Sequence, residues 1–103
     1  MKIRFLYFKG CPNAKPALKL LKEVLKEKNI KDKIEVIEIK SEEDAKKYKF
    51  LGSPSIQING LDIEKQKHKC PPVFGCRVYH TKDGLSGVPP KEMIIRALEE
   101  IKK

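Results

Sequence analysis

The chain has 103 residues, with 23 Lys and Arg against 14 Asp and Glu, which gives a formal net charge of +9. A chain of this length forms one domain and has no room for a second independent core. Hydrophobic residues make up 40% of it and charged residues 36%, a balance that excludes disorder beyond the last few residues. We therefore expect a single domain over residues 1–103.

Targeting signals are not apparent in the sequence. No apolar run approaches the roughly 18 to 20 residues that cross a bilayer, and the apolar stretch near the N-terminus is short and contains charges. We therefore expect a cytoplasmic protein with no membrane partner. Nearly all the basic residues are lysine, glutamate is frequent and Trp is absent, a composition typical of thermophile proteins.

The first third of the chain predicts a strand, a helix and a second strand. Residues 3–8 are rich in β-branched and aromatic side chains, which indicates a buried strand. Over residues 13–28, apolar side chains recur every three or four positions opposite a lysine stripe, which predicts an amphipathic helix with Pro16 in its first turn. Residues 34–39 predict a strand parallel to the first, because a helix of crossover length separates the two.

The middle of the chain predicts a short helix and a hairpin. Ser41 is followed by three acidic residues, the pattern of an N-cap with acidic side chains in the first helical turn. After an interruption at residues 52–54, residues 55–58 predict a third strand. A two-residue Asn-Gly turn then leads into a fourth strand at residues 61–63.

The last third of the chain has weaker patterns until its final helix. Residues 64–75 show no clean period and contain two adjacent prolines, so we interpret them as an irregular insertion. Residues 77–80 predict a further short strand, or the resumption of the fourth strand after the insertion. Residues 83–87 predict a loop and residues 90–101 an amphipathic helix. The element order β-α-β-α-β-β-α predicts an α/β fold with a mixed four-stranded sheet and helices on both faces.

The three cysteines are Cys11, Cys70 and Cys76. An odd number in an intracellular chain leaves at least one thiol unpaired, which favours thiol chemistry over a complete disulfide framework. Cys11 stands just before the first predicted helix, where unpaired amides and the helix dipole favour a thiolate. We therefore expect Cys11 to be the reactive cysteine.

Two turns give the chain a resemblance to a known group of proteins. A cysteine at a strand-to-helix turn, in Gly-Cys-Pro-Asn-Ala over residues 10–14, and a Ser-Pro pair at residues 53–54 are followed by a hairpin and a closing helix. Together these features resemble the thioredoxin-like superfamily over nearly the whole chain. Residues 50–62, 76–79 and 84–89 more narrowly resemble small prokaryotic thioredoxin-like proteins, some of them labelled alkylmercury-lyase-like.

The resemblance implies thiol–disulfide exchange at a one-cysteine site. Cys11 would be the nucleophile, and Ala14 stands where a dithiol oxidoreductase has its second cysteine. Release of a mixed disulfide then needs another thiol, and we expect Cys76, before Cys70, to lie near Cys11 and supply it. The resemblance further implies a substrate groove that contains Pro12, Ser53 and Pro54, with a cis Ser-Pro bond and an exposed Ser53 backbone that pairs with substrate.

Several alternatives remain open at the cysteines. Cys11 could be a buried, inert thiol, and the whole chain a non-catalytic thioredoxin-like adaptor. Cys70 and Cys76 could form a disulfide or a metal half-site with His68, or remain two separate thiols. If Cys11 converges with them, the three could bind a thiophilic metal or an organomercurial.

Other classes of ligand find little support in the sequence. Lysines at positions 65, 67 and 69 form the densest basic patch, but no aromatic residues are interleaved with them, so we do not expect a nucleic-acid partner. His80 is interpreted as a surface residue. The sequence indicates no cofactor, and we expect a monomer whose partners are protein or small-molecule thiols and disulfides.

Overall fold

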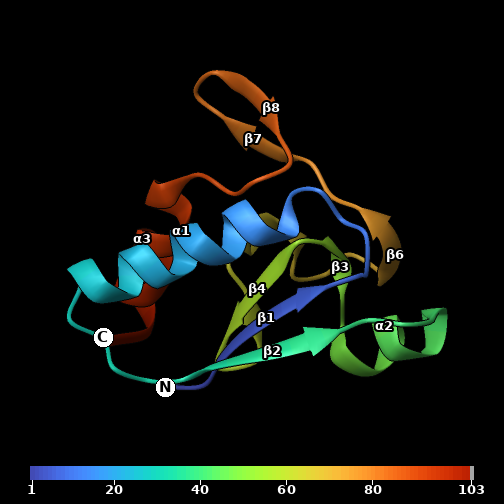
Figure 1. The fold of residues 1–103 in the computed structure, drawn as a ribbon, viewed down its shortest axis with the longest axis horizontal. Helices are drawn as coiled ribbons and strands as arrows, with labels where there is room; N and C mark the ends of the chain where they lie inside the picture. Colours follow the sequence, from blue (N-terminus) through green and yellow to red (C-terminus); the bar gives the residue numbers. More distant parts are fainter. Residues whose placement is uncertain (103) are drawn as a thin grey trace.

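The computed structural model describes residues 1–102, apart from the side chains at 66, 101 and 102. Its centre is a mixed four-stranded sheet (Figure 1) in the order β2-β1-β4-β5. These strands are β2 (Ile34–Glu38), β1 (Ile3–Tyr7), β4 (Ser55–Ile58) and β5 (Leu61–Asp62). β2 runs parallel to β1, and β4 runs antiparallel to both β1 and β5. The α/β class and the mixed four-stranded sheet are therefore confirmed.

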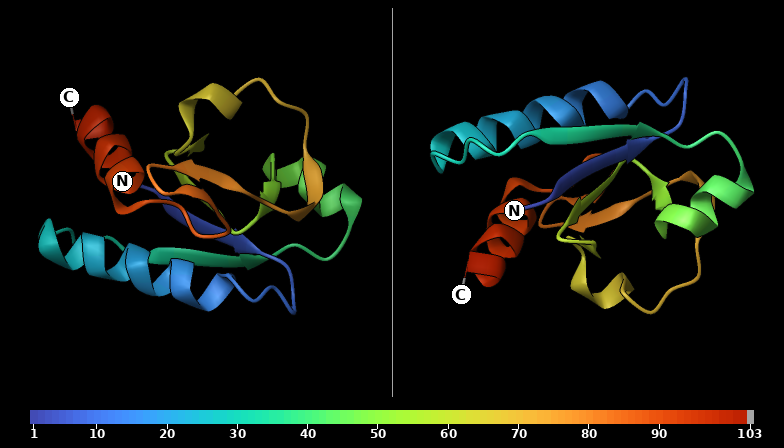
Figure 2. Two further views of the ribbon diagram at one scale, coloured as in Figure 1. Left: turned by 90° about the horizontal axis from the view of Figure 1, so that it is seen from above. Right: turned by 90° about the horizontal axis from the view of Figure 1, so that it is seen from below.

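In the part of the chain that the structure describes, three α-helices cover the sheet. They are α1 (Ala14–Glu27), α2 (Glu42–Tyr48) and α3 (Lys91–Lys102). Successive side chains of a strand point to opposite faces, and β1 is apolar on both. Ile3 and Phe5 pack with α1 and α3, whereas Leu6 packs with Ala45 of α2. Figures 1 and 2 show α1 and α3 together on one side of the sheet and α2 on the other.

The helices begin where the sequence predicts. Pro16 lies in the first turn of α1, where its missing N–H has no intrahelical partner to lose. At α2, the Asp44 N–H donates to Ser41 Oγ at 3.1 Å, which confirms Ser41 as the N-cap. Across residues 1–102, no helix is long and apolar enough to cross a bilayer.

The insertion is more ordered than expected. Residues 65–67 form a 3₁₀ turn, η1 (Lys65–Lys67), and the segment ends in strand β6 (Val73–Cys76). β6 pairs in parallel with β3 (Leu51–Ser53), another strand that the sequence did not reveal. The expectation of an irregular segment over residues 64–75 is therefore wrong at its C-terminal end. Strands of three and four residues are too short to show a period, and each contains a glycine.

A second correction concerns residues 77–87. The strand there is β7 (Tyr79–Thr81), and it pairs with β8 (Gly84–Ser86) in a short antiparallel hairpin. The sequence predicted a strand two residues earlier, followed by a loop. Figure 1 shows this hairpin extending from the body of the protein above α1.

Candidate functional site

A chain of hydrogen bonds links the Cys11 turn to the end of β3. The Cys11 N–H donates to Phe8 O at 3.3 Å, and the Phe8 N–H donates to Ser53 Oγ at 3.3 Å. Ser53 in turn lies opposite Cys76 in the β3–β6 pair. The carboxyl ends of β1, β3 and β6 thus bring Cys11, Ser53 and Cys76 to one end of the molecule.

Cys11 occupies a tight turn before α1. Its side chain is half-buried and packs against the core formed by α1, α3 and the sheet, whereas Pro12 is exposed. The Ala14 N–H donates to Cys11 O at 3.3 Å and closes the turn. The loop after β8 presses on the same turn, since a Cβ placed on Gly87 would lie 2.1 Å from Asn13 Nδ2. The Cys11 thiol therefore sits on a turn that is fixed from two sides.

The Ser53–Pro54 turn differs from the expected substrate groove. The peptide bond between the two residues is cis, and both residues are buried. Ser53 is 0% exposed, and its carbonyl oxygen accepts a hydrogen bond from the Arg77 N–H at 3.0 Å. The expectation that Ser53 offers an exposed backbone to a substrate is therefore wrong. The segment that follows β6 already uses this carbonyl, and β6 lies along β3.

A buried charged cluster, which we call the Arg77 cluster, adjoins this turn. Arg77 donates from Nη1 to Asp62 Oδ1 at 2.8 Å and from Nη2 to Asp62 Oδ2 at 2.6 Å. The same two nitrogens reach Ser55 Oγ and Glu64 Oε1, each at 3.0 Å. The three charged side chains are only 3 to 7% exposed. The paired geometry compensates for much of the cost of burying these charges.

The charge state of Arg77 follows from its partners. Burial lowers the pKa of the guanidinium, but the hydrogen bonds to Asp62 and Glu64 and the nearby charges outweigh burial, so the pKa lies above its ordinary value. Arg77 therefore stays positively charged. Its Nε atom is buried without a hydrogen-bond partner among the residues described.

Tyr79 completes the cluster and ties it to the cis peptide. The Arg77 guanidinium lies 4.4 Å from the centre of the Tyr79 ring, and the Tyr79 hydroxyl donates to Pro54 O at 2.5 Å. Burial raises the pKa of Tyr79 above its ordinary value of 10, although the charge of Arg77 lowers it in part. Arg77 thus binds the carbonyl oxygen of Ser53, and Tyr79 binds that of Pro54.

No sequence motif singles out this cluster. Arg77 and Ser55, which are hydrogen-bonded in it, lie 22 residues apart along the chain. One signal was present: polar or charged residues alternate with apolar ones at Asp62, Ile63 and Glu64, and again around Arg77. Such alternation is typical of chain with one buried face. Arg77 directly follows β6, which pairs with β3, and that position brings it to Asp62 and Glu64.

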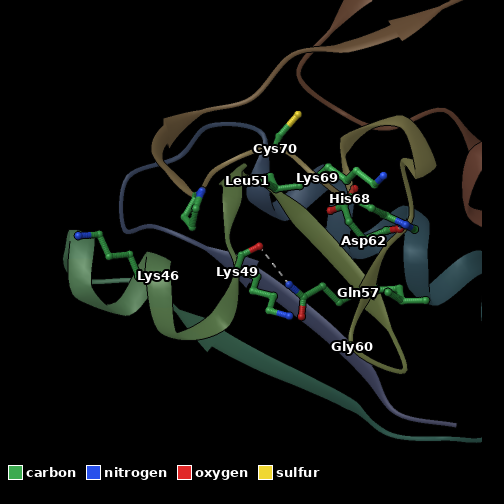
Figure 3. A pocket seen from close by; sticks show the side chains of 11 residues that line it. Lys46, Lys49, Leu51, Gln57, Gly60, Asp62, His68, Lys69 and Cys70 are labelled. Atoms are coloured by element: carbon green, nitrogen blue, oxygen red, sulfur yellow. Dashed lines mark hydrogen bonds between the residues drawn. The ribbon is translucent and has the colours of Figure 1, made fainter.

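Cys70 and Cys76 are exposed, and all three cysteines are free thiols. Cys70 lines a pocket of about 400 Å³ together with Lys46, Lys49 and His68. Figure 3 shows its sulfur pointing away from Asp62 and Gln57. His68 is engaged by the backbone, with its Nε2 atom 2.6 Å from Asp62 O.

Metal binding was one of the alternatives for these residues. Among the side chains that the structure describes, no three His, Cys, Asp or Glu residues gather closely enough to hold a metal ion. The convergence of Cys11, Cys70 and Cys76, and the His68 half-site, are therefore not found. His80 is exposed on β7, as expected of a surface residue.

Comparison with known proteins gives one family. No curated protein and no solved structure matches the chain. A family model described as a domain of unknown function, DUF2703, matches residues 12–98, which include α1, α2, most of α3, the Ser53–Pro54 turn and the Arg77 cluster. The match spans most of the chain, and the protein therefore belongs to the DUF2703 family.

Proposed function

We propose that this chain is a thioredoxin-like thiol protein that carries out thiol–disulfide exchange through Cys11. The observation that supports it most is the link from Cys11 through Phe8 and Ser53 to the strand that carries Cys76. Two thiols from distant parts of the sequence are thereby brought to the same end of the molecule. The cis Ser53–Pro54 bond beside the Cys11 turn agrees with the fold assignment.

The first step is attack on the substrate. The Cys11 thiolate attacks one sulfur of a disulfide R–S–S–R′, so that a Cys11–S–S–R bond forms and R′S⁻ leaves and takes a proton from water. Cys11 precedes the N-terminus of α1, a position typical of reactive cysteines. Cys11 is half-buried, so the substrate sulfur must enter between its turn and the neighbouring loops.

The second step releases the substrate. Ala14 occupies the position of a local second cysteine, so we assign resolution to Cys76. The Cys76 thiolate attacks the Cys11 sulfur, forms a Cys11–Cys76 disulfide and expels RS⁻. The substrate disulfide has then gained two electrons and the protein has lost two. An external thiol reductant returns the protein to its starting state.

A stoichiometric reaction with 5,5′-dithiobis(2-nitrobenzoate) tests both steps. In a Cys70→Ser background, one equivalent of reagent should release two thionitrobenzoate ions and leave a protein without an adduct. The matched Cys76→Ser protein should release one ion and keep the other bound to Cys11. Intact-mass measurement distinguishes the two products. Retention of an adduct when Cys76 is present would refute its resolving role, and an unchanged initial rate in Cys11→Ser would refute Cys11 as the nucleophile.

A further inference from the structure

Strand β6 presents large apolar side chains to solvent. Val73 is 48% and Phe74 43% exposed. In the part of the chain that the structure describes, β6 pairs with β3 alone, and Figure 1 shows it at the periphery of the molecule. An unpaired, apolar strand edge is a template for another strand, and proteins usually protect such edges. Such an open edge is a candidate binding site for another strand.

The direction of the backbone amides shows what this edge offers. The Val73 N–H donates to Phe50 O at 2.8 Å and the Arg77 N–H donates to Ser53 O at 3.0 Å, so both point toward β3. Neighbouring amides of an extended strand point to opposite sides. The amides of Phe74 and Cys76 are therefore directed away from β3, where an added strand can accept from them.

The same edge leads to the two thiols. The rings of Phe74 and Phe8 meet edge to face with their centres 6.1 Å apart, and Phe8 O accepts the hydrogen bond from the Cys11 N–H. Cys76 is the last residue of β6, and it is exposed. A segment lying along β6 would thus reach the end of the molecule where Cys11 and Cys76 lie.

The charge beside the outer edge of β6 indicates which kind of partner can bind there. A hollow of about 440 Å³ lies beside Phe8 and Phe74, and its charged lining is Lys9, Lys40 and Glu38. Two lysines against one glutamate leave it basic, on a chain whose formal net charge is +9. A second copy of the chain would bring two such charges together, whereas an acidic partner is attracted.

We infer that the outer edge of β6 binds an extended acidic segment of a partner protein, which adds a strand to β6 and lays an apolar side chain against Phe74. Main-chain hydrogen bonds would supply affinity, and the apolar contact and the lysines would supply selectivity. The identification of this segment as the carrier of the disulfide rests on the proposed function. Binding itself does not.

Anisotropy with a labelled octapeptide of alternating Val and Glu tests the inference. The protein carries Cys11→Ser and Cys76→Ser, so no exchange can occur. We expect the acidic peptide to bind about tenfold more tightly than a matched peptide with Lys in place of Glu. Equal affinities for the two peptides would overturn the inference. So would a dimer of the free protein, seen by sedimentation, that the peptide cannot dissociate.

Two variants of Phe74 separate the contribution of its side chain to peptide binding from that of its backbone amide. Phe74→Ala removes the ring and keeps the N–H, whereas Phe74→Pro removes both without touching an amide that faces β3. Binding should weaken several-fold in the first and by at least a further several-fold in the second. Val36→Ala is the matched control, because Val36 is 49% exposed on β2. An unchanged affinity in Phe74→Pro, with an unchanged circular dichroism spectrum, would overturn the inference.

The two proposals fail in different ways. Peptide binding together with a retained adduct in the Cys70→Ser protein would retain the β6 edge as a docking site and reject the proposed exchange between Cys11 and Cys76. Release of two thionitrobenzoate ions by the Cys70→Ser protein, without peptide binding, would retain exchange at Cys11 and reject the β6 edge.

Discussion

Arg77 is the residue on which the surroundings of the candidate site depend most. It supplies the positive charge between two buried carboxylates, Asp62 and Glu64, and its backbone N–H holds the carbonyl of Ser53. Its neighbour Cys76 is the proposed resolving thiol. The position of Cys76 relative to Ser53 therefore depends on how firmly Arg77 is held.

Replacement of Arg77 by Ala should be strongly destabilising. The substitution leaves Asp62 and Glu64 buried without their cation, and breaking a buried pair in this way costs about 3–5 kcal/mol. The matched control is Arg4→Ala, since the Arg4–Glu35 pair is partly exposed and should be worth less than about 1 kcal/mol. Urea denaturation measures both free energies of unfolding. Equal losses of unfolding free energy in the two variants would show that the buried cluster stabilises the fold no more than a partly exposed ion pair does.

Tyr79 should make stability depend on pH in the alkaline range. Burial raises its pKa above 10, so above pH 10 the unfolded chain loses this proton while the folded chain keeps it. The free energy of unfolding should then fall by about 1.4 kcal/mol per pH unit from this group. Tyr79→Phe should remove this contribution and should cost about 1 kcal/mol at neutral pH through loss of the hydrogen bond to Pro54 O.

Because the whole chain responds to alkaline pH, the Tyr79→Phe result must be compared with that of a second tyrosine variant. Tyr48→Phe serves this purpose, because Tyr48 is only half-buried. Unfolding measured from pH 8 to 11 should give the wild-type slope in Tyr48→Phe and a shallower slope in Tyr79→Phe. Equal slopes in the wild type and in both variants would show that Tyr79 does not cause the pH dependence of stability.

At the scale of elements, the β3–β6 pair joins the two halves of the candidate site. Gly52 in β3 has φ +106°, and a Cβ there would lie 2.9 Å from the Cβ of Arg77. Only glycine allows both this backbone conformation and this close approach. The distance between β3 and the segment after β6 is thus set by one missing side chain.

Gly52→Ala should therefore loosen the pairing of β3 with β6. We expect a loss of about 1–3 kcal/mol from overpacking, in addition to the backbone strain of a positive φ. Gly60→Ala separates the two causes, since Gly60 has φ +83° and, among the described residues, nothing lies within 4 Å of the place its methyl group would take. Thermal unfolding of the two variants provides the comparison. A loss in Gly52→Ala no greater than in Gly60→Ala would show that close packing at this point is unimportant.

Whether an element could be predicted depends on whether the residues that determine it are neighbours in the sequence. The strands at 3–8 and 34–39 and the helix at 13–28 have periodic patterns over several residues, and the structure contains them. β3 and β6 have three and four residues, and they exist because they pair with each other between residues 22 and 23 positions apart in the chain. A local pattern carries no information about such a pairing.

The residues of the candidate site also divide into those with a local sequence signal and those without one. Cys11 and the Ser53–Pro54 pair stand out because a turn residue or proline has a local meaning. Burial of Ser53 and the capture of its carbonyl by Arg77 depend on β6, so neither could be predicted from local patterns. The error about Ser53 therefore has the same cause as the error about residues 64–75.

At the scale of the whole molecule, the fold gives the three thiols very different surroundings. Cys70 and Cys76 are exposed, whereas Cys11 is half-buried at the start of α1. Exposure alone favours reaction at Cys70 and Cys76. The proposed function instead requires Cys11, the thiol that precedes the N-terminus of α1, to react fastest.

Competitive labelling with a limiting amount of iodoacetamide, followed by peptide mass spectrometry, tests this requirement most directly. In the folded protein, Cys11 should be labelled about tenfold faster than Cys70 or Cys76, although it is the least exposed. In urea, where α1 is lost, the three rates should become similar. Faster labelling of Cys70 and Cys76 in the folded protein, with Cys11 accelerated by urea, would contradict the role of Cys11 as the nucleophile.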